Sequence, residues 1–400
     1  MPQKLENIEI SNFKRFLLFA LYSSTLFCVL AAASVPTPLY PHYQEVFNFS
    51  NAMLTIIFAA YAISLLATLL ISGSISDYIG RKVVISIALA LQIISMWWFY
   101  ASSSVFDLII ARLLQGAATG LATSALGAVL VDLDKRLGGT IAVASSMLGL
   151  SSGVILSSLL IQFSEEPAQS IFKTLIIVYL LQGFLVLIDE ERISKRAGVL
   201  YSLQPKINIS TNLKDVIKYL APVNMVGWAL CGFYLALMPL LNKEIAQFTT
   251  PFINSFLIFV LPFTGGLTSI YFRNKESIKS IKVASFSMFL GIISIILGAL
   301  TENILWLFTA GILSGIGFGA GFLGTQKSML ERTEEFERSG TISLFYIISY
   351  LPFSIPVVLA GVSIQNSDLI TTTIFFSTIL SVICLWVAFK SYSFRKCRMP

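Results

Sequence analysis

The sequence has little charge, and this scarcity excludes most classes of soluble protein. Only 12% of its 400 residues are charged, whereas 56% are hydrophobic and the mean hydropathy is +0.81. Soluble domains of ordinary composition carry about twice that share of charge, ~25%. We therefore expect a polytopic membrane protein without a separate soluble domain.

The chain also lacks the residues that most catalytic and metal sites need. It contains one histidine and four cysteines, and no cysteine pair stands at metal-ligand spacing. Neither the phosphate-binding pattern G-x-x-x-x-G-K-[ST] nor the zinc pattern H-E-x-x-H occurs. We predict that the protein is not an enzyme and that it binds no metal or cofactor.

Long hydrophobic runs recur along the whole chain instead. Each is close to the ~20 residues that a helix needs to cross a bilayer core of about 30 Å. The twelve expected helices are 16–39, 52–72, 83–100, 105–131, 140–162, 171–188, 216–240, 252–272, 282–299, 303–326, 340–363 and 369–389. This predicts an all-α membrane fold.

One long polar stretch, 189–215, separates six helices from six. The expected domains are therefore an N-terminal six-helix bundle, 1–190, a cytoplasmic linker, 191–215, and a C-terminal six-helix bundle, 216–400.

The basic residues predict the orientation of the helices. All 27 except Arg112, Lys173 and Lys243 fall in the termini or in alternate connections, which belong on the cytoplasmic side. We expect a multi-pass protein of the cytoplasmic (inner) membrane with both termini inside and the first helix retained. The net charge of +6 then reflects topology and anionic lipid, so membrane lipid is an expected partner and nucleic acid is not.

The connection between the second and third helices, GSISDYIGRK at 73–82, concentrates charge and glycine. Gly73 permits close approach of helices, and Gly80 permits a turn that a side chain would hinder. Asp77 can accept hydrogen bonds from a basic side chain or from a helix N-terminus.

The two halves carry traces of a repeat, as is common in transporters built around a central site. Gly265 and Arg273 repeat the spacing of Gly73 and Arg81. The fourth expected helix carries the pattern G-x-x-x-G at 116–120, and the tenth carries the same pattern at 315–319.

The chain resembles the major facilitator superfamily over essentially its whole length. Residues Gly73, Asp77, Gly80, Arg81 and Lys82 match the family's loop motif G-x-x-x-D-x-x-G-R-[KR]. Arg112 and Gln115 match its R-x-x-Q-G motif, and the proline pair at 38 and 41 is similar to one in drug and metabolite exporters. The resemblance implies two pseudo-symmetric six-helix bundles, transport by alternating access, and a cytoplasmic gate formed by the loop motif together with Asp132.

Arg112 is the expected coupling or substrate residue, with Gln115 one turn away. A buried arginine is costly unless it faces a cavity or a partner. The alternative is that Arg112 reaches outward to lipid headgroups, beside Asp107.

No acidic residue falls in the middle third of an expected helix, although many drug–proton antiporters that the chain resembles carry an acid in helix 1. Proton coupling would then depend on Asp107, Glu45 or His42, each near an expected helix end. The antiporter motif of helix 5 is also incomplete, because Val154 stands in place of its proline.

The lack of a central acid, together with Arg112, favours a neutral or anionic small-molecule substrate. Uncharged polar side chains would give specificity, or else bond helix to helix. These candidates are Tyr22, Ser23, Thr25, Asn224, Tyr346 and Tyr350.

We expect a monomeric secondary transporter that exports a drug-like or metabolite molecule in exchange for protons, as in the drug/metabolite:proton antiporter branch. One alternative is proton-coupled uptake of a small organic anion. The other is a membrane sensor or assembly factor that does not transport.

Overall fold

A computed structural model describes residues 11–191, 213–245, 251–334, 338–364 and 367–393, and these residues form helices with no strand. The helices of the N-terminal half are α1 (Asn12–Ser34), the 3₁₀ turn η1 (Thr37–Leu39), α2 (Tyr40–Phe47), α3 (Asn51–Ser72), α4 (Ser76–Ile79), α5 (Arg81–Tyr100), α6 (Val105–Leu133), α7 (Gly138–Phe163) and α8 (Pro167–Ile188). Those of the C-terminal half are α10 (Lys214–Tyr219), α11 (Pro222–Ala236), α12 (Met238–Ile245), α13 (Pro251–Phe272), α14 (Ser277–Thr301), α15 (Ile304–Leu330), α16 (Arg338–Ser363) and α17 (Leu369–Ser393).

Eleven helical segments of the described residues, with α1 to α2 counted as one, are long and apolar enough to cross a membrane. The bent pair α11 and α12 makes a twelfth span if it is counted as one. The polytopic all-α fold expected from the sequence is therefore confirmed. Most of the expected linker, 192–212, and the end of the chain lie outside the described residues.

Two spans differ from their predicted form because prolines interrupt them. The first helix ends at Ser34, not at residue 39, and the chain continues through η1 and α2 to Phe47. The seventh span, expected as one helix over 216–240, is divided into α10, α11 and α12, with a bend of 59° between the last two. Proline at the start of a helix is tolerated because the first turn does not need its N–H, so each proline begins a new segment.

The two halves use the same close helix pairing. A Cβ on Gly120 of α6 would lie 2.9 Å from the carbonyl oxygen of Leu65 in α3, and Gly116 meets that helix one turn earlier. In the second half, Gly315 and Gly319 of α15 meet the backbone of α13 in the same way. Small residues let two backbones approach where no side chain would fit. The repeat between α6 and α15 is thus visible in their packing.

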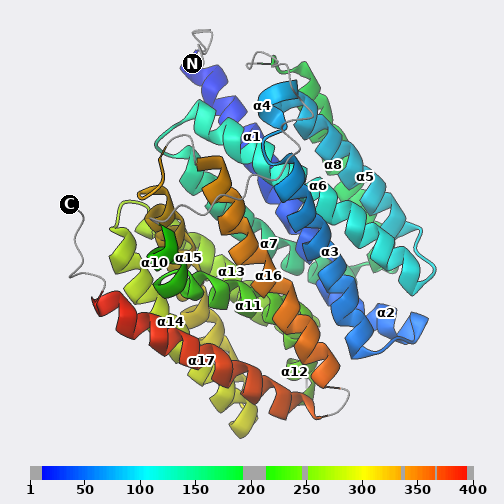
Figure 1. Cartoon of the computed structure of the whole chain (residues 1–400). Coiled ribbons are helices and arrows are strands. Elements are labelled where there is room, and N and C mark those ends of the chain that lie inside the picture. Colours follow the sequence, from blue (N-terminus) through cyan, green and yellow to red (C-terminus); the bar gives the residue numbers. More distant parts are fainter. Residues whose placement is uncertain (1–10, 192–212, 246–250, 335–337, 365–366, 394–400) are drawn as a thin grey trace.

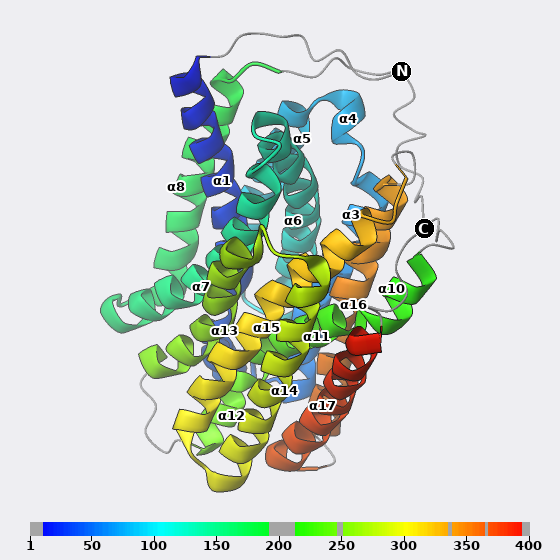
Figure 2. The ribbon, with the colours of Figure 1, turned by 90° about the vertical axis from the view of Figure 1, so that its left-hand side faces the viewer.

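The halves contact each other mainly through two helix pairs, α3 with α16 and α7 with α13 (Figures 1 and 2). We call the end that carries α4 the α4 end, and the opposite end, which carries α2 and α12, the α2 end (Figure 1). Toward the α2 end, Thr55 of α3 packs directly on Gly361 of α16. One turn deeper, the rings of Phe58 and Phe353 lie 4.9 Å apart across the interface.

Candidate functional site

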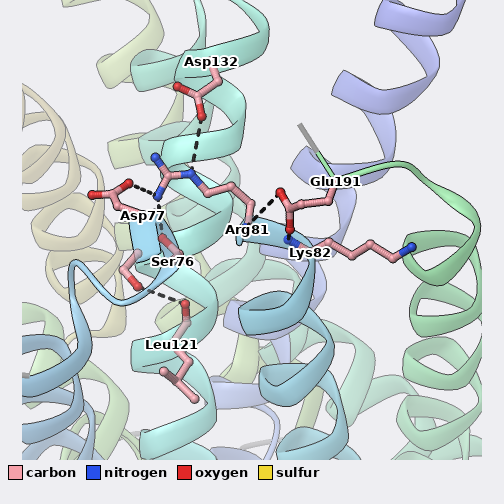
Figure 3. Close-up of polar contacts among 8 residues, drawn as sticks. Ser76, Asp77, Arg81, Lys82, Leu121, Asp132 and Glu191 are labelled. Carbon is pink, nitrogen blue, oxygen red and sulfur yellow. Dashed lines mark hydrogen bonds and ion pairs between the residues drawn. The ribbon is translucent and has the colours of Figure 1, made fainter. Parts of the chain in front are cut away.

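The connection between α3 and α5 holds a chain of charged contacts (Figure 3). Asp77 Oδ1 lies 2.6 Å from Arg81 Nη1, and Arg81 Nε lies 3.4 Å from Asp132 Oδ2 at the end of α6. Arg81 also donates to the hydroxyl of Ser76. One guanidinium therefore joins the loop to α6, and the structure brings Asp77, Arg81 and Asp132 together.

Glu191 is a further member of this cluster. Its carboxylate accepts hydrogen bonds from the backbone N–H groups of Arg81, at 3.2 Å, and Lys82, at 2.9 Å (Figure 3). These are the first two residues of α5, so the carboxylate lies at the positive end of the helix dipole. Gly80 has φ +107°, and a Cβ on it would collide with the Glu191 carboxylate. Gly80 is needed for both its backbone conformation and the space that Glu191 occupies.

Lys82 binds the C-terminal end of a helix, whereas Glu191 binds an N-terminal end. Its ammonium donates to the carbonyl oxygens of Leu187, at 2.7 Å, and Asp189, at 2.6 Å, where α8 ends. A cation is stabilised there because the helix dipole is negative at its C-terminus. The buried carboxylate of Asp189 in turn accepts a 2.6 Å hydrogen bond from Tyr22 of α1. The end of α8 is therefore fixed to both α5 and α1.

These contacts brace the N-terminal half at its α4 end. Among the described residues, Asp77, Arg81 and Lys82 have partners only within that half. The crowding at Gly73 is likewise local, since a Cβ there would lie 2.5 Å from the carbonyl oxygen of Leu69. For Asp77, Arg81 and Lys82, the contacts in the described part of the chain therefore do not join the two halves.

Asp134, two residues beyond Asp132, ties the start of α1 to the same end. Hydrogen bonds from the backbone N–H groups of Leu137 and Arg136 hold the pKa of its carboxyl below the usual range. Arg15 lies 3.6 Å from the carboxylate. The Arg15 side chain is exposed, so the ion pair adds little stability.

Arg112 is fully buried inside the N-terminal half. Its Nε donates to the Tyr40 hydroxyl at 2.8 Å, and its Nη1 donates to Gln115 Oε1, at 2.7 Å, and to the Ala33 carbonyl oxygen, at 2.8 Å. These acceptors are all uncharged. The rings of Tyr40, Tyr61 and Phe99 lie 5.5 to 5.8 Å from its guanidinium carbon. Arg112 points into the protein, not toward lipid headgroups.

The backbone acceptors near Arg112 exist because α1 is interrupted by proline. Pro36 has no N–H with which to bond the carbonyl of Ala32, four residues earlier. That oxygen accepts from Gln115 Nε2 at 2.9 Å instead. Arg112 takes the next carbonyl, that of Ala33. The proline-rich segment 36–41 and the R-x-x-Q motif therefore form one hydrogen-bonded unit.

The three rim residues expected to carry protons lie apart from Arg112. Glu45 and His42 are exposed on α2. Asp107 accepts hydrogen bonds from Ser103 and Ser104 at the start of α6. The structure does not bring any of these residues to the guanidinium.

A small cavity lies between the two halves. It is lined by Leu30, Ala33, Phe58, Tyr61, Leu150, Trp228, Leu235, Tyr350 and Phe353. In this conformation its volume is about 10 Å³, room for about one water molecule. Tyr61 separates the cavity from Arg112, since the guanidinium lies over its ring. The lining is therefore apolar and aromatic, with a positive charge close behind it.

Of the six uncharged polar candidates, Tyr350 lines this cavity. Asn224 bonds Ser349 at 2.9 Å, and Tyr346 stacks beside Tyr350 with ring centres 6.2 Å apart. The other three lie on α1, where Ser23 and Thr25 bond carbonyls of their own helix and Tyr22 bonds Asp189.

Sequence reasoning missed Glu191, Asp189, Tyr40 and Trp228. The run of acids at 189–191 is typical of the start of a linker, yet an acid is also the partner that a helix N-terminus favours. Tyr40 stands inside the proline pair that was noted. Trp228 had no local pattern that would mark it.

Comparisons with known proteins fit this architecture. A family model described as Major Facilitator Superfamily matches residues 22–357. The chain is also similar to the quinolone resistance protein NorA of Staphylococcus aureus strains Mu50, N315 and COL. In each case 23% of 116 aligned residues are identical, covering 29% of this chain and 30% of the relative. The match thus spans less than a third of these relatives.

Glu191→Gln should lower stability, because the amide keeps an acceptor but loses the charge at the start of α5. We expect a loss of about 1 kcal/mol and faster amide exchange at residues 81–84. Thermal unfolding and hydrogen exchange of the purified protein measure both. Glu190→Gln is the control, since Glu190 is exposed and only approaches Lys14 at 3.6 Å. Equal behaviour of the two variants would contradict the helix-capping role.

Tyr40→Phe should destabilise the protein by about 2 kcal/mol, because it removes the acceptor of a buried charged donor. Tyr234→Phe serves as the control. Tyr234 is as deeply buried, but its hydrogen bond to the Leu307 carbonyl oxygen is long, at 3.5 Å. Unfolding midpoints compare the two. If they fall equally, Tyr40 is not essential to the Arg112 network.

Proposed function

The chain belongs to the Major Facilitator Superfamily and is a membrane transporter, and we propose that it exports a small drug-like or metabolite molecule in exchange for protons. The observation that carries this proposal is the cavity formed jointly by the two halves. Residues from α1, α3 and α7 face residues from α11 and α16 there. A site shared by two bundles can open to either side of a membrane when the bundles rock.

Export is favoured by the similarity to proteins named for quinolone resistance. Removal of a drug from the cell would be one way for a membrane transporter to give such resistance. A neutral or anionic molecule fits the cavity best, because Arg112 lies behind its wall and the lining residues carry no charge.

We infer the orientation from the basic residues. Arg81, Lys82 and Lys135 lie at the α4 end, which we place in the cytoplasm together with both termini. We propose that the protein works as a monomer in the cytoplasmic membrane, with residues 1–190 and 216–400 as its two moving units and anionic lipid at the α4 end.

The loop motif would act as a gate in the other conformation. In this structure it braces one half, and the halves touch toward the α2 end. Rocking would separate that contact and bring the loop to the C-terminal half. Asp77 and Arg81 would then trade contacts within their own half for contacts across the interface.

Flux in vesicles tests the function. Everted vesicles with an acidic lumen should accumulate a fluorescent quinolone that carries a carboxylate and no basic amine, and a protonophore should abolish the accumulation. Asp77→Asn should lower the initial rate several-fold at equal protein level. Glu276→Gln, an exposed acid in the corresponding connection of the second half, should leave the rate unchanged.

Other outcomes of the flux experiment would support one of the two alternative functions. Accumulation only in right-side-out vesicles would indicate uptake, for which a small organic anion is the candidate. No flux and no pH dependence across a broad panel of neutral and anionic compounds would overturn transport in favour of a sensor or assembly factor.

A further inference from the structure

Aromatic rings dominate the central cavity and come from both halves. Five of the nine lining residues are aromatic: Phe58 and Tyr61 from the N-terminal half, and Trp228, Tyr350 and Phe353 from the C-terminal half. The remaining four are aliphatic. This composition gives a ligand flat, polarisable surfaces and no fixed charge.

The rings now contact one another. Trp228 lies 4.8 Å from Tyr350 and 5.5 Å from Phe353, and Phe353 lies 4.9 Å from Phe58 of the other half. Aromatic pairs at these separations gain energy beyond their buried area. Parting of the two halves would break the contact between Phe58 and Phe353. A flat aromatic molecule inserted there would replace the lost contact on both sides.

Trp228 also offers a hydrogen bond that the described protein does not use. The residue is buried, with a relative exposure of 7%, and its Nε1 has no acceptor among the described residues. An indole N–H can only donate. A ligand oxygen would satisfy this donor, whereas a ligand ammonium would not.

The nearest charge points to the same ligand chemistry. The Arg112 guanidinium lies 5.5 Å from the centre of the Tyr61 ring, and its hydrogen-bond acceptors are uncharged. A cation in the cavity would meet this positive charge through a thin apolar wall, where screening is weak. A carbonyl or carboxylate oxygen would not be penalised in this way.

We propose that the cavity binds a flat aromatic molecule that carries a carbonyl or carboxylate group, with its ring between Phe58 and Phe353 and its oxygen accepting from Trp228 Nε1. This inference rests on the proposed function, because it names the substrate class of the same site. It adds a residue, Trp228, that selects acceptor-bearing ligands over purely apolar or cationic ones.

Equilibrium binding of matched probes tests the proposal. 2-Acetylnaphthalene and 2-ethylnaphthalene share the naphthalene ring and a two-carbon side chain, and only the ketone has a hydrogen-bond acceptor. With empty micelles subtracted, the purified protein should prefer the ketone by about three- to tenfold, the value of one hydrogen bond. 2-Naphthylmethylammonium should bind more weakly than either.

The variant Trp228→Phe keeps an aromatic ring and deletes the N–H. It should bind 2-ethylnaphthalene with an affinity close to that of the unaltered protein, and its preference for the ketone should disappear. Trp306→Phe is the control, since Trp306 is partly exposed at the start of α15, away from the cavity lining. It should keep the full preference.

Equal binding of ketone and ethyl compound by the unaltered protein would overturn the proposal, as would a preference that survives in Trp228→Phe. Binding and flux fail separately. A Trp228-dependent preference without proton-driven flux would refute the transport proposal and uphold the site. Proton-driven flux of other compounds, with no preference between the probes, would uphold the transport proposal and refute the proposed binding site.

Discussion

The constraint on which this structure depends is a buried guanidinium that must be satisfied without an acid. Arg112 is fully buried, and its hydrogen-bond acceptors are a hydroxyl, an amide and a backbone carbonyl. An ionised side chain inside a membrane protein costs several kcal/mol unless its surroundings compensate it. The interruption of α1 supplies these surroundings, because the prolines that end it also free its last carbonyls and place Tyr40 at the start of α2. Without this break, α1 would use those oxygens internally.

The same network shapes the cavity. Tyr61 lies between Arg112 and the space shared by the two halves, so the arginine acts on the cavity through an aromatic wall. In the site we propose, the positive field would disfavour cations, while the rings would favour flat apolar surfaces. At the α4 end the charged side chains are structural. Arg81, Lys82 and Glu191 connect helix ends to one another within one half. In the transporter we propose, the buried charge would set the ligand chemistry, and the surface charge would set which helices move together.

The sequence was sufficient to predict the polytopic helical fold, since hydrophobic runs must form helices in lipid. It was also sufficient to single out the residues of the loop motif, whose spacing is local. It could not provide partners that lie far along the chain. Glu191 is 110 residues from Arg81, and Tyr40 is 72 residues from Arg112. Trp228 lies on the largely apolar helix α11, where no local pattern distinguishes a residue that lines a cavity from one that is packed. The prolines of the seventh span divide it, but the residues around the break are mostly apolar, so hydropathy alone predicts one continuous helix.

The central claim is that the two halves rock about the aromatic cavity while the loop motif engages at the α4 end. In protein whose native cysteines are replaced, spin labels at Lys135 and Asn274 report the distance between the halves at the α4 end, and labels at Ala101 and Thr301 report it at the α2 end. Pulsed electron resonance in lipid nanodiscs measures both distances with and without 2-acetylnaphthalene across a range of pH. We expect a second population in which the α4-end distance shortens and the α2-end distance lengthens, and we expect Asp77→Asn to deplete it. Distances that stay fixed, or that change in the same direction at both ends, would contradict this claim.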